Sequence, residues 1–598
     1  ANTVTDGSTL NNTLTSVTLN NAATGTYTGL AIANVSATGM TGDVTVVNTT
    51  AAHTQNYTLS GITAGTYTDA NATTVNIVSN GTATNVLTGL SNTLATKINV
   101  TGTTGLTFGT LTADAAAVID ASAISGTNTI TLGGAGQKYV GGTGADVVTT
   151  AGALQTVTVD GGTGTDTLKL TANAEFATTG AAKFLNFETL SIGAAITALD
   201  VTKFTGSTFT SAVLNGGVVN LSGLTAAQAA AITAAASGTY TIAPTGAAVV
   251  GQLDTVGMVV SDSLAAVNTI TLTTPVLTGV ETLNLTATDN IVINALTSST
   301  ALTNVNVTGA GTVSITSGAL ALNVNTAIDA TANNSAVVLN FAAGTANGVS
   351  LKAGNGNNTL TGTDIASKGN SIVSGNGNST LTGGQADDVF TAGTGNNIIV
   401  TGAGANTVTV GSGNNTITGG AGVDTITAGN GINVISAAGG ADVITVGTGY
   451  NLITGGAGAD IITFGTHVAG VTDGVIYTAA AESFQGAVTS GTTVLTGADI
   501  ITGLKSGDTI SLYAAATCTT ATTVGTSLIA AAGVTDAVAI IKGNYSATTG
   551  IFTASSSGTD SLVEWDGNGT TAAGTIETIV LVGFAGTLAT GTNVLTLV

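Results

Sequence analysis

Carboxylate and amide side chains recur at a fixed interval between residues 374 and 463, where ten nonapeptides follow one another without a gap. The sixth residue of each nonapeptide is Asp, Asn or Ser, the eighth is always apolar, and Gly fills the second and fourth positions of most copies. Short carboxylates in glycine-rich turns supply the oxygen ligands that Ca²⁺ prefers. The spacing therefore predicts multiple calcium sites along this part of the chain.

The elements that would position these ligands follow from the same pattern. The first six residues of a copy favour a turn, in which Gly supplies the backbone conformations, and the last three favour a short strand with the eighth residue pointing inward. The pattern resembles the nonapeptide repeat of RTX proteins, which binds calcium in a parallel β-roll. That resemblance implies two nonapeptides per coil, with calcium between turn loops stacked on one edge. A disordered glycine-rich linker would not keep an aliphatic residue at every eighth place.

Residues 18 apart share an edge in such a roll, and the acidic residues segregate. Neighbouring strands lie about 4.8 Å apart, so stacked carboxylates would repel by roughly 3 kcal/mol at an effective dielectric near 20. We therefore expect calcium to occupy the acidic edge strongly and the other edge weakly or not at all. The sixth positions of the first, here named the Asp edge, are Asp388, Asn406, Asp424, Asp442 and Asp460; those of the second, the Asn edge, are Ser379, Asn397, Asn415, Asn433 and Asn451.

The predicted metal ligands lie in these turns and in two looser copies upstream. Segments 133–148 and 159–170 carry similar turns, in which Asp146 and Asp166 take the calcium position, and a plain Gly turn between strands is the alternative there. His467 follows the last repeat, and we expect it to be solvent-exposed or capping rather than a ligand. Within the repeats the predicted ligands are Asp388, Asn406, Asp424, Asp442, Asp460, Gly420, Gly422, Gly440, Gly456 and Gly458.

Composition favours an all-β fold and restricts the partners. Of the 598 residues, 43% are hydrophobic but only 4% aromatic and 7% charged, so a core would consist of Ala, Val, Ile and Leu. The net charge of −22, with nine Lys and no Arg, makes nucleic acid an improbable partner. A single Cys rules out a disulfide framework, and polar residues interrupt every apolar run before it could span a membrane. Only segment 224–236 has the pattern of a helix.

We predict a parallel β-solenoid, an RTX β-roll, with additional β-rich N- and C-terminal domains. For the N-terminal domain the sequence does not distinguish a sandwich from more solenoid. The expected segments are 1–130, an N-terminal β-rich domain; 131–170, a short RTX-like calcium segment; 171–350, an irregular β-solenoid; 351–465, the nonapeptide β-roll; and 466–598, a C-terminal β-rich domain associated with type I secretion.

Catalytic motifs are missing from the sequence. There is no H-E-x-x-H, no G-x-S-x-G and no P-loop. A lyase on a β-helix would need basic and acid/base residues in a groove, which nine Lys and no Arg make a poor fit. The Thr-x-Thr triplets typical of ice-binding solenoids are interrupted by Val434, Val443, Leu452 and Ile461, so we expect neither activity and predict that the protein is not an enzyme.

Beyond the repeats, segments 497–512 (GADIITGLKSGDTISL) and 560–584 (DSLVEWDGNGTTAAGTIETIVLVGF) resemble the C-terminal region of RTX-type surface-layer proteins. The resemblance implies a structural subunit, exported by a type I secretion apparatus, that assembles with itself into a calcium-dependent two-dimensional lattice on the bacterial surface. Lipopolysaccharide or another cell-surface glycan would anchor it. An RTX-type secreted adhesin is the alternative. The two differ in calcium, where a lattice protein should form sheets by itself and an adhesin should stay monomeric until offered a ligand.

Overall fold

The structure is a computed structural model in two compact units, Ala1–Asp289 and Asn290–Val598. Nearly every element is a β-strand, and no helix among the described residues is long and apolar enough to cross a membrane. The helices are α1 (Ala226–Ala229) and the 3₁₀ helices η1 (Asn173–Phe176), η2 (Ala181–Lys183) and η3 (Val201–Lys203). The structure describes residues 2–5, 14–21, 24–28, 31–48, 50–177, 179–247, 254–296, 301–316, 326–342, 348–479, 482–485, 492–495, 497–513, 521–522, 538–566, 576–584, 586–591 and 594–598.

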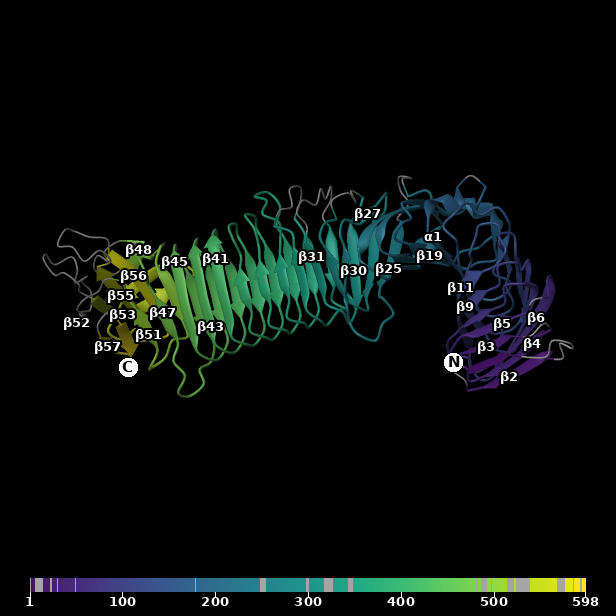
Figure 1. Ribbon diagram of the computed structural model, residues 1–598. Coiled ribbons are helices and arrows are strands. Elements are labelled where there is room, and N and C mark those ends of the chain that lie inside the picture. The colour runs from purple at the N-terminus through teal and green to yellow at the C-terminus, as the bar shows by residue number, and fades with distance from the viewer. Residues whose placement is uncertain are drawn as a thin grey trace. The chain divides into compact units, whose positions relative to one another are not determined.

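The first unit is a parallel solenoid in which alternate strands stack in separate sheets (Figure 1). One sheet stacks β2 (Ser16–Asn20), β4 (Asn34–Thr38), β6 (His53–Ser60), β8 (Ala72–Asn80), β10 (Lys97–Gly102), β12 (Val118–Ile124), β14 (Lys138–Val140), β16 (Val159–Asp160) and β18 (Phe184–Leu185). A later sheet holds β20 (Ala198–Asp200), β22 (Gly217–Leu224), β24 (Gly238–Pro244), β26 (Thr269–Leu272) and β27 (Val276–Leu277). The third runs through β1 (Asn2–Thr5), β3 (Gly25–Thr28), β5 (Val44–Val47), β7 (Thr66–Thr68), β9 (Asn85–Ser91), β11 (Leu106–Thr112), β13 (Thr129–Thr131), β15 (Val147–Thr149), β17 (Thr167–Leu170), β19 (Thr189–Gly193), β21 (Ser211–Asn215), β23 (Ile232–Ala234), β25 (Thr255–Val260) and β28 (Thr282–Ala287).

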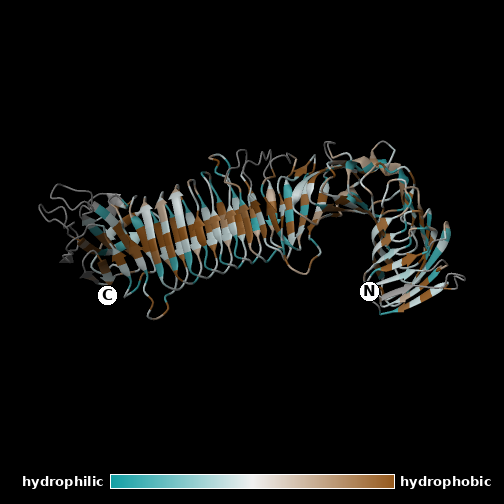
Figure 2. Cartoon of the chain, viewed as in Figure 1, coloured by the Kyte–Doolittle hydropathy of each residue, from teal (hydrophilic) through white to brown (hydrophobic). Residues whose placement is uncertain are grey.

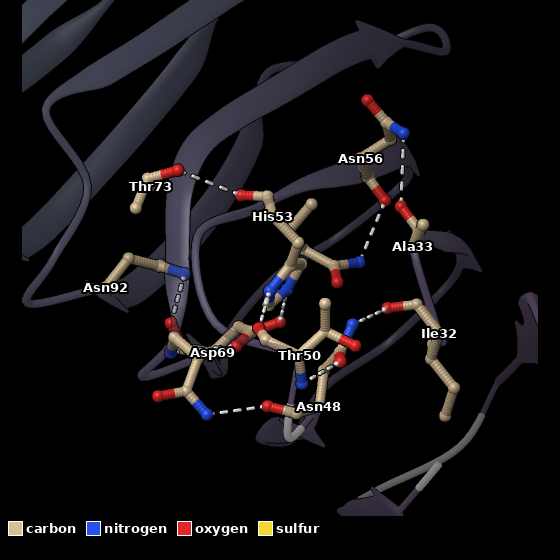
Figure 3. A network of polar contacts seen from close by, with 11 residues as sticks. Ile32, Ala33, Asn48, Thr50, His53, Asn56, Asp69, Thr73 and Asn92 are labelled. Atoms are coloured by element: carbon tan, nitrogen blue, oxygen red, sulfur yellow. Dashed lines mark hydrogen bonds and ion pairs between the residues drawn. The ribbon is translucent and has the colours of Figure 1, made fainter. Parts of the chain in front are cut away.

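Stacked amides and a partnered histidine order the coils of this unit. Along the series Asn34, Asn56, Asn76 and Asn99, Nδ2 of each residue donates to Oδ1 of the one before, at 3.0, 2.8 and 2.7 Å. At the start of β6, His53 places Nδ1 2.7 Å from the carbonyl oxygen of Thr50 and Nε2 2.8 Å from Oδ2 of Asp69 (Figure 3). Both ring nitrogens of this histidine therefore have partners.

The second unit continues as a regular two-sheet roll (Figure 1). The sheet that begins each coil on the Asp edge comprises β30 (Asn304–Gly309), β32 (Ala327–Ala330), β34 (Ser350–Ala353), β36 (Ser371–Ser374), β38 (Val389–Ala392), β40 (Thr407–Val410), β42 (Thr425–Ala428), β44 (Val443–Val446), β46 (Ile461–Phe464), β50 (Asp499–Thr502) and β56 (Ile576–Val582). The opposite sheet comprises β29 (Asn290–Ile293), β31 (Val313–Thr316), β33 (Val337–Asn340), β35 (Thr359–Thr361), β37 (Thr380–Thr382), β39 (Ile398–Val400), β41 (Asn415–Ala421), β43 (Asn433–Gly439), β45 (Asn451–Ala457), β47 (Gly474–Ile476) and β51 (Thr509–Ser511).

The eighth residues of the nonapeptides form the core of the roll, as the sequence predicts. Parallel register places each one on its counterpart 18 residues away, and all ten are at most 1% exposed. Figure 2 shows hydrophobic residues repeating from strand to strand along these coils. One sheet contributes Phe390, Val408, Ile426, Ile444 and Ile462, and the other Leu381, Ile399, Ile417, Ile435 and Ile453. The predicted fold class, a parallel β-solenoid with an RTX-type β-roll, is confirmed.

Mainly antiparallel strands pair with the last coils and with one another, whereas residues 521–522 pair in parallel with residues 539–540. A buried cluster of Leu495, Ala498, Ile541, Phe552, Leu562 and Val580 forms their core. Trp565 is fully buried and packs edge-on against Tyr477, with ring centroids 5.0 Å apart. The strands are β48 (Phe484–Gln485), β49 (Thr492–Val494), β52 (Ala521–Thr522), β53 (Val538–Ser546), β54 (Ile551–Ala554), β55 (Asp560–Asp566), β57 (Leu588–Gly591) and β58 (Val594–Leu597).

The predicted helix over 224–236 is wrong for most of its length. Only Ala226–Ala229 is helical, and Thr225 caps it with a capping box that includes Gln228. The following residues Ile232–Ala234 form β23, which pairs in parallel with β21 and β25. Burial of Ile232 in the stacked core outweighs the helix propensity of the alanines around it.

Candidate metal centres

The sixth-position side chains of the Asp edge form a continuous ladder. Each side-chain Oδ1 accepts a hydrogen bond from the backbone N–H of the sixth residue one coil nearer the N-terminus. The distance between the acceptor Oδ1 and the donor N is 2.8 Å for Asn406 Oδ1 and Asp388 N, and 2.8 Å for Asp424 Oδ1 and Asn406 N. It is 2.7 Å for Asp442 Oδ1 and Asp424 N, and 2.8 Å for Asp460 Oδ1 and Asp442 N. The ladder holds these side chains at the start of each strand, and all five are at most 1% exposed. The predicted acidic ligands are therefore brought together.

The Oδ2 atoms of the Asp-edge carboxylates accept few hydrogen bonds. Oδ2 of Asp442 and Oδ2 of Asp460 are buried and accept no hydrogen bond from any residue that the structure describes. Oδ2 of Asp388 accepts from the backbone N–H of Gly384 at 2.7 Å, and Oδ2 of Asp424 only a long bond of 3.4 Å from Gly420. A buried carboxylate without a partner is costly, and a cation removes that cost.

Burial and neighbouring charge shift the acidity of this column. Burial, together with the negative charge of the adjacent Asp424, raises the pKa of Asp442 to about 6. Burial, with Asp442 and Glu482 nearby, raises the pKa of Asp460 to about 7. Burial also raises the pKa of Asp388 and of Asp424. Without a cation these carboxylates therefore hold their protons up to a higher pH than ordinary Asp side chains, and a bound metal would take the place of those protons.

The predicted glycine ligands bring backbone carbonyls to the same edge. A methyl group on Gly440 would lie 2.0 Å from the carbonyl oxygen of Gly422, and one on Gly458 would lie 1.5 Å from that of Gly440. Gly422, Gly440 and Gly458 also have φ values of +130°, +145° and +147°, which residues with a side chain rarely adopt. Gly420 and Gly456 are as tightly placed, with a methyl group 1.7 Å from Gly402 O and 1.9 Å from Ala438 O respectively.

The first Gly of a nonapeptide leaves space beside the carboxylate. A methyl group on Gly455 would lie 2.2 Å from Oδ2 of Asp460, and one on Gly419 would lie 2.6 Å from Oδ2 of Asp424. Carboxylate and carbonyl oxygens are the donor set of a calcium site, so the residues present fit Ca²⁺. A bound Ca²⁺ would supply positive charge between the coils, and the chain's own side chains hold the carboxylates in place for it.

Asn406 and the residues of the Asn edge place neutral amides at the positions where other coils of the Asp edge have carboxylates. Nδ2 of Asn406 donates to the carbonyl oxygen of Gly404 at 3.0 Å, so this rung of the Asp edge is neutral and internally bonded. On the Asn edge, Nδ2 of Asn415 donates to Gly413 O at 3.1 Å and to Oδ1 of Asn433 at 2.9 Å. Amide protons thus occupy carbonyls that a cation would otherwise use, and calcium occupancy of the two edges stays a prediction.

The two upstream acids form a ladder of the same kind in the first unit. Oδ1 of Asp146 accepts from the backbone N–H of Asn128 at 2.7 Å, and Oδ1 of Asp166 accepts from that of Asp146 at 2.6 Å. Oδ2 of Asp166 is buried and has no hydrogen bond within the described chain, and burial raises the pKa of Asp166 to about 7. Glu188 continues the ladder, because its Oε2 accepts from the N–H of Asp166 at 2.8 Å.

The ladder of the second unit extends beyond the residues that the spacing predicts. The N–H of Asn370 donates to Oδ1 of Asp388, and the N–H of Asp460 donates to Oδ1 of Asp499 at 2.8 Å. Asp499 is fully buried, and burial raises its pKa well above the ordinary range. A signal was present, since residues 497–502 repeat the letters GADIIT of residues 458–463. An insertion makes this coil 39 residues long, so a strict 18-residue period misses it.

Comparison with known proteins agrees with this geometry. Residues 367–399, 400–435 and 436–466 match the family model described as RTX calcium-binding nonapeptide repeat (4 copies). No curated protein matches the chain. The matched residues coincide with the regular coils that carry Asp388 through Asp460. They therefore support an RTX-type protein, in which calcium-binding nonapeptide repeats form a parallel β-roll within a longer solenoid.

Proposed function

We propose that the protein is a secreted structural subunit that folds on binding calcium outside the cell and assembles with itself into a two-dimensional surface layer. The observation that carries this proposal is a row of exposed side chains, three of five apolar, along one sheet of the roll. Val389, Val443 and Ile461 occupy the seventh position of their repeats and are 48%, 37% and 42% exposed. Thr407 and Thr425 complete the row, one coil apart.

The opposite face has the same character. Ile398 and Val434 are 51% and 41% exposed at the equivalent position of the other sheet. Threonines separate some of these apolar residues on both sheets. Exposed apolar side chains gathered on a surface mark interaction sites, and two such faces on one roll suit repeated contacts between copies. The shortage of Lys and the absence of Arg leave these faces without the charges that commonly block such association.

Calcium would restrict folding, and therefore assembly, to the outside of the cell. The buried carboxylates destabilise the roll where calcium is scarce, so a chain inside the cell would stay unfolded and suited to export by a type I apparatus. Calcium outside the cell stabilises only the folded form, because binding and folding are coupled. Attachment to lipopolysaccharide or another surface glycan is part of the same proposal.

Electron microscopy of the full chain in millimolar calcium, and again in a chelator, tests the proposal, with circular dichroism reporting folding. We expect ordered sheets in calcium that dissolve in chelator. Calcium-dependent folding without sheets would contradict the lattice and favour the adhesin, which would assemble only when offered a ligand. Absence of any calcium response would contradict both.

A triple variant sharpens the test. Replacing Val389, Val443 and Ile461 by Lys should abolish the sheets while calcium-induced folding persists. The control places the same three charges at Leu94, Leu154 and Leu264, which are exposed apolar residues of the first unit. Loss of sheets in both variants would show that added charge alone prevents assembly and would contradict the role of this face.

A further inference from the structure

The Asn edge does not end in asparagine. Its ladder continues from Asn451 to two acids, because the backbone N–H of Asn451 donates to Oδ1 of Asp473 at 2.7 Å and that of Asp473 donates to Oδ1 of Asp508 at 2.8 Å. These acids directly precede β47 and β51, which pair in parallel. Asp473 and Asp508 are 4% and 0% exposed. The neutral edge thus closes with two buried carboxylates.

His467 faces this pair. It lies in the loop between β46 and β47, and its side chain is only 10% exposed, so the expected solvent-exposed histidine is wrong. Nε2 lies 3.2 Å from Oδ2 of Asp473, and Nδ1 lies 3.5 Å from Oδ2 of Asp508. Nε2 is buried yet makes no hydrogen bond to any residue in the described part of the chain, since the contact with Asp473 lacks hydrogen-bond geometry.

The three side chains have the spacing of metal ligands. One ligand atom from each of them lies within 4.8 Å of the other two. Tetrahedral zinc with bonds of about 2.1 Å places its ligand atoms about 3.4 Å apart, close to the 3.2 Å between His467 and Asp473. Both Oδ1 atoms accept the ladder hydrogen bonds, so the Oδ2 atoms would be the ligands. Oδ2 of Asp508 also accepts from the backbone N–H of Lys505 at 2.6 Å and would bind an ion through its other lone pair.

We propose that His467, Asp473 and Asp508 bind one divalent transition-metal ion of the zinc class, separately from the calcium ladder. Calcium takes oxygen ligands, whereas an imidazole with two carboxylates is typical of zinc and its neighbours. The ion would tie the loop after the last regular repeat to the turn before β51 and neutralise the two acids at this end of the Asn edge. The residues next to His467 on either side, Thr466 and Val468, are exposed, which leaves the loop open to an entering ion.

Zinc titration of the full chain, folded in saturating calcium, tests the site by calorimetry. Co²⁺ then serves as a second probe, since nitrogen–oxygen coordination gives visible absorption bands. We expect one zinc ion to bind with micromolar or tighter affinity, with millimolar calcium failing to displace it. His467→Gln should weaken zinc binding by roughly tenfold or more and remove the cobalt bands.

The chain has only two histidines, so the other one is a matched control. His53 has both ring nitrogens hydrogen-bonded in the first unit (Figure 3), and His53→Gln should leave zinc binding unchanged. Asp473→Asn keeps an oxygen for the N–H of Asn451 but removes a charge, and it decides the test if His467→Gln fails to fold. Unchanged zinc affinity in Asp473→Asn or in folded His467→Gln, equal loss in His53→Gln, or displacement by calcium would overturn the proposal.

Discussion

Asp460→Asn should stabilise the calcium-free roll and destabilise the calcium-bound one. The side chain is fully buried, and burial raises its pKa to about 7 from an ordinary 3.8. A shift of that size costs the folded state about 4 kcal/mol above pH 7, because each pKa unit corresponds to 1.36 kcal/mol. Asn removes the charge, keeps Oδ1 for the N–H of Asp442, and can donate Nδ2 to loop carbonyls as Asn451 does to Gly449 at 3.0 Å.

The sign of the pH dependence follows from the raised pKa. Between pH 3.8 and 7 the folded roll binds more protons than the unfolded chain, so its stability in chelator falls as the pH rises through this window. Below the window the penalty is absent, and above it the penalty is complete. In chelator, wild type should therefore gain stability between pH 8 and pH 5, whereas Asp460→Asn should gain less.

Hydrogen exchange is the suitable assay, because a solenoid unfolds locally rather than as one unit. In chelator at pH 8, amide protection in β44 and β46 should rise in Asp460→Asn, with an upper limit of about a thousandfold from 4 kcal/mol. In calcium the order should reverse, since one carboxylate ligand is lost. Asp387→Asn removes the same charge from an exposed position and should change little. Lower protection of Asp460→Asn in chelator, or an equal rise in Asp387→Asn, would refute the reasoning.

Three further outcomes are expected. Gly440→Ala should destabilise the roll by about 2 kcal/mol or more, because the φ of Gly440 is +145° and a methyl group there would lie 2.0 Å from a carbonyl oxygen. A methyl group on the neighbouring Gly439 meets nothing closer than 4.0 Å, so Gly439→Ala should destabilise the roll only slightly. Thermal unfolding in calcium compares the two variants. Ile444→Ala should cost about 2–5 kcal/mol by the same measurement, and Thr445→Ala on the exposed side much less. A crystal structure grown in calcium should show ions along the Asp edge, and equal occupancy on the Asn edge would contradict the amide argument.

Where coils had constant length, the sequence predicted the fold and which sixth-position side chains share an edge. The eighth-position core and the grouping of Asp388, Asp424, Asp442 and Asp460 follow from the 18-residue period alone. In the first unit, the paired positions Asn34, Asn56, Asn76 and Asn99 show coils of 22, 20 and 23 residues. Without a constant period, a solenoid there could not be told from a sandwich.

The missed residues share a physical cause. Asp499 and Asp508 join their ladders across coils lengthened by insertions. Glu188 joins the ladder of the first unit with a side chain one methylene longer than the Asp or Asn that the pattern expects. The stack selects the residue at or directly before the start of each strand, whatever its distance along the chain. His467 was misjudged because its burial depends on two acids that the spacing did not place beside it.

The direction of the ladder bonds makes the two ends of the roll unequal. Removing coils from the N-terminal side takes away only donors and leaves carboxylate oxygens that water can solvate. Removing the coil of Asp499 would instead leave the N–H of Asp460 without its acceptor, and the unpaired donor would pass to each new last coil. The N-terminal end of the ladder therefore presents acceptor oxygens and the C-terminal end presents N–H donors, so the groups that cap the roll must differ at its two ends.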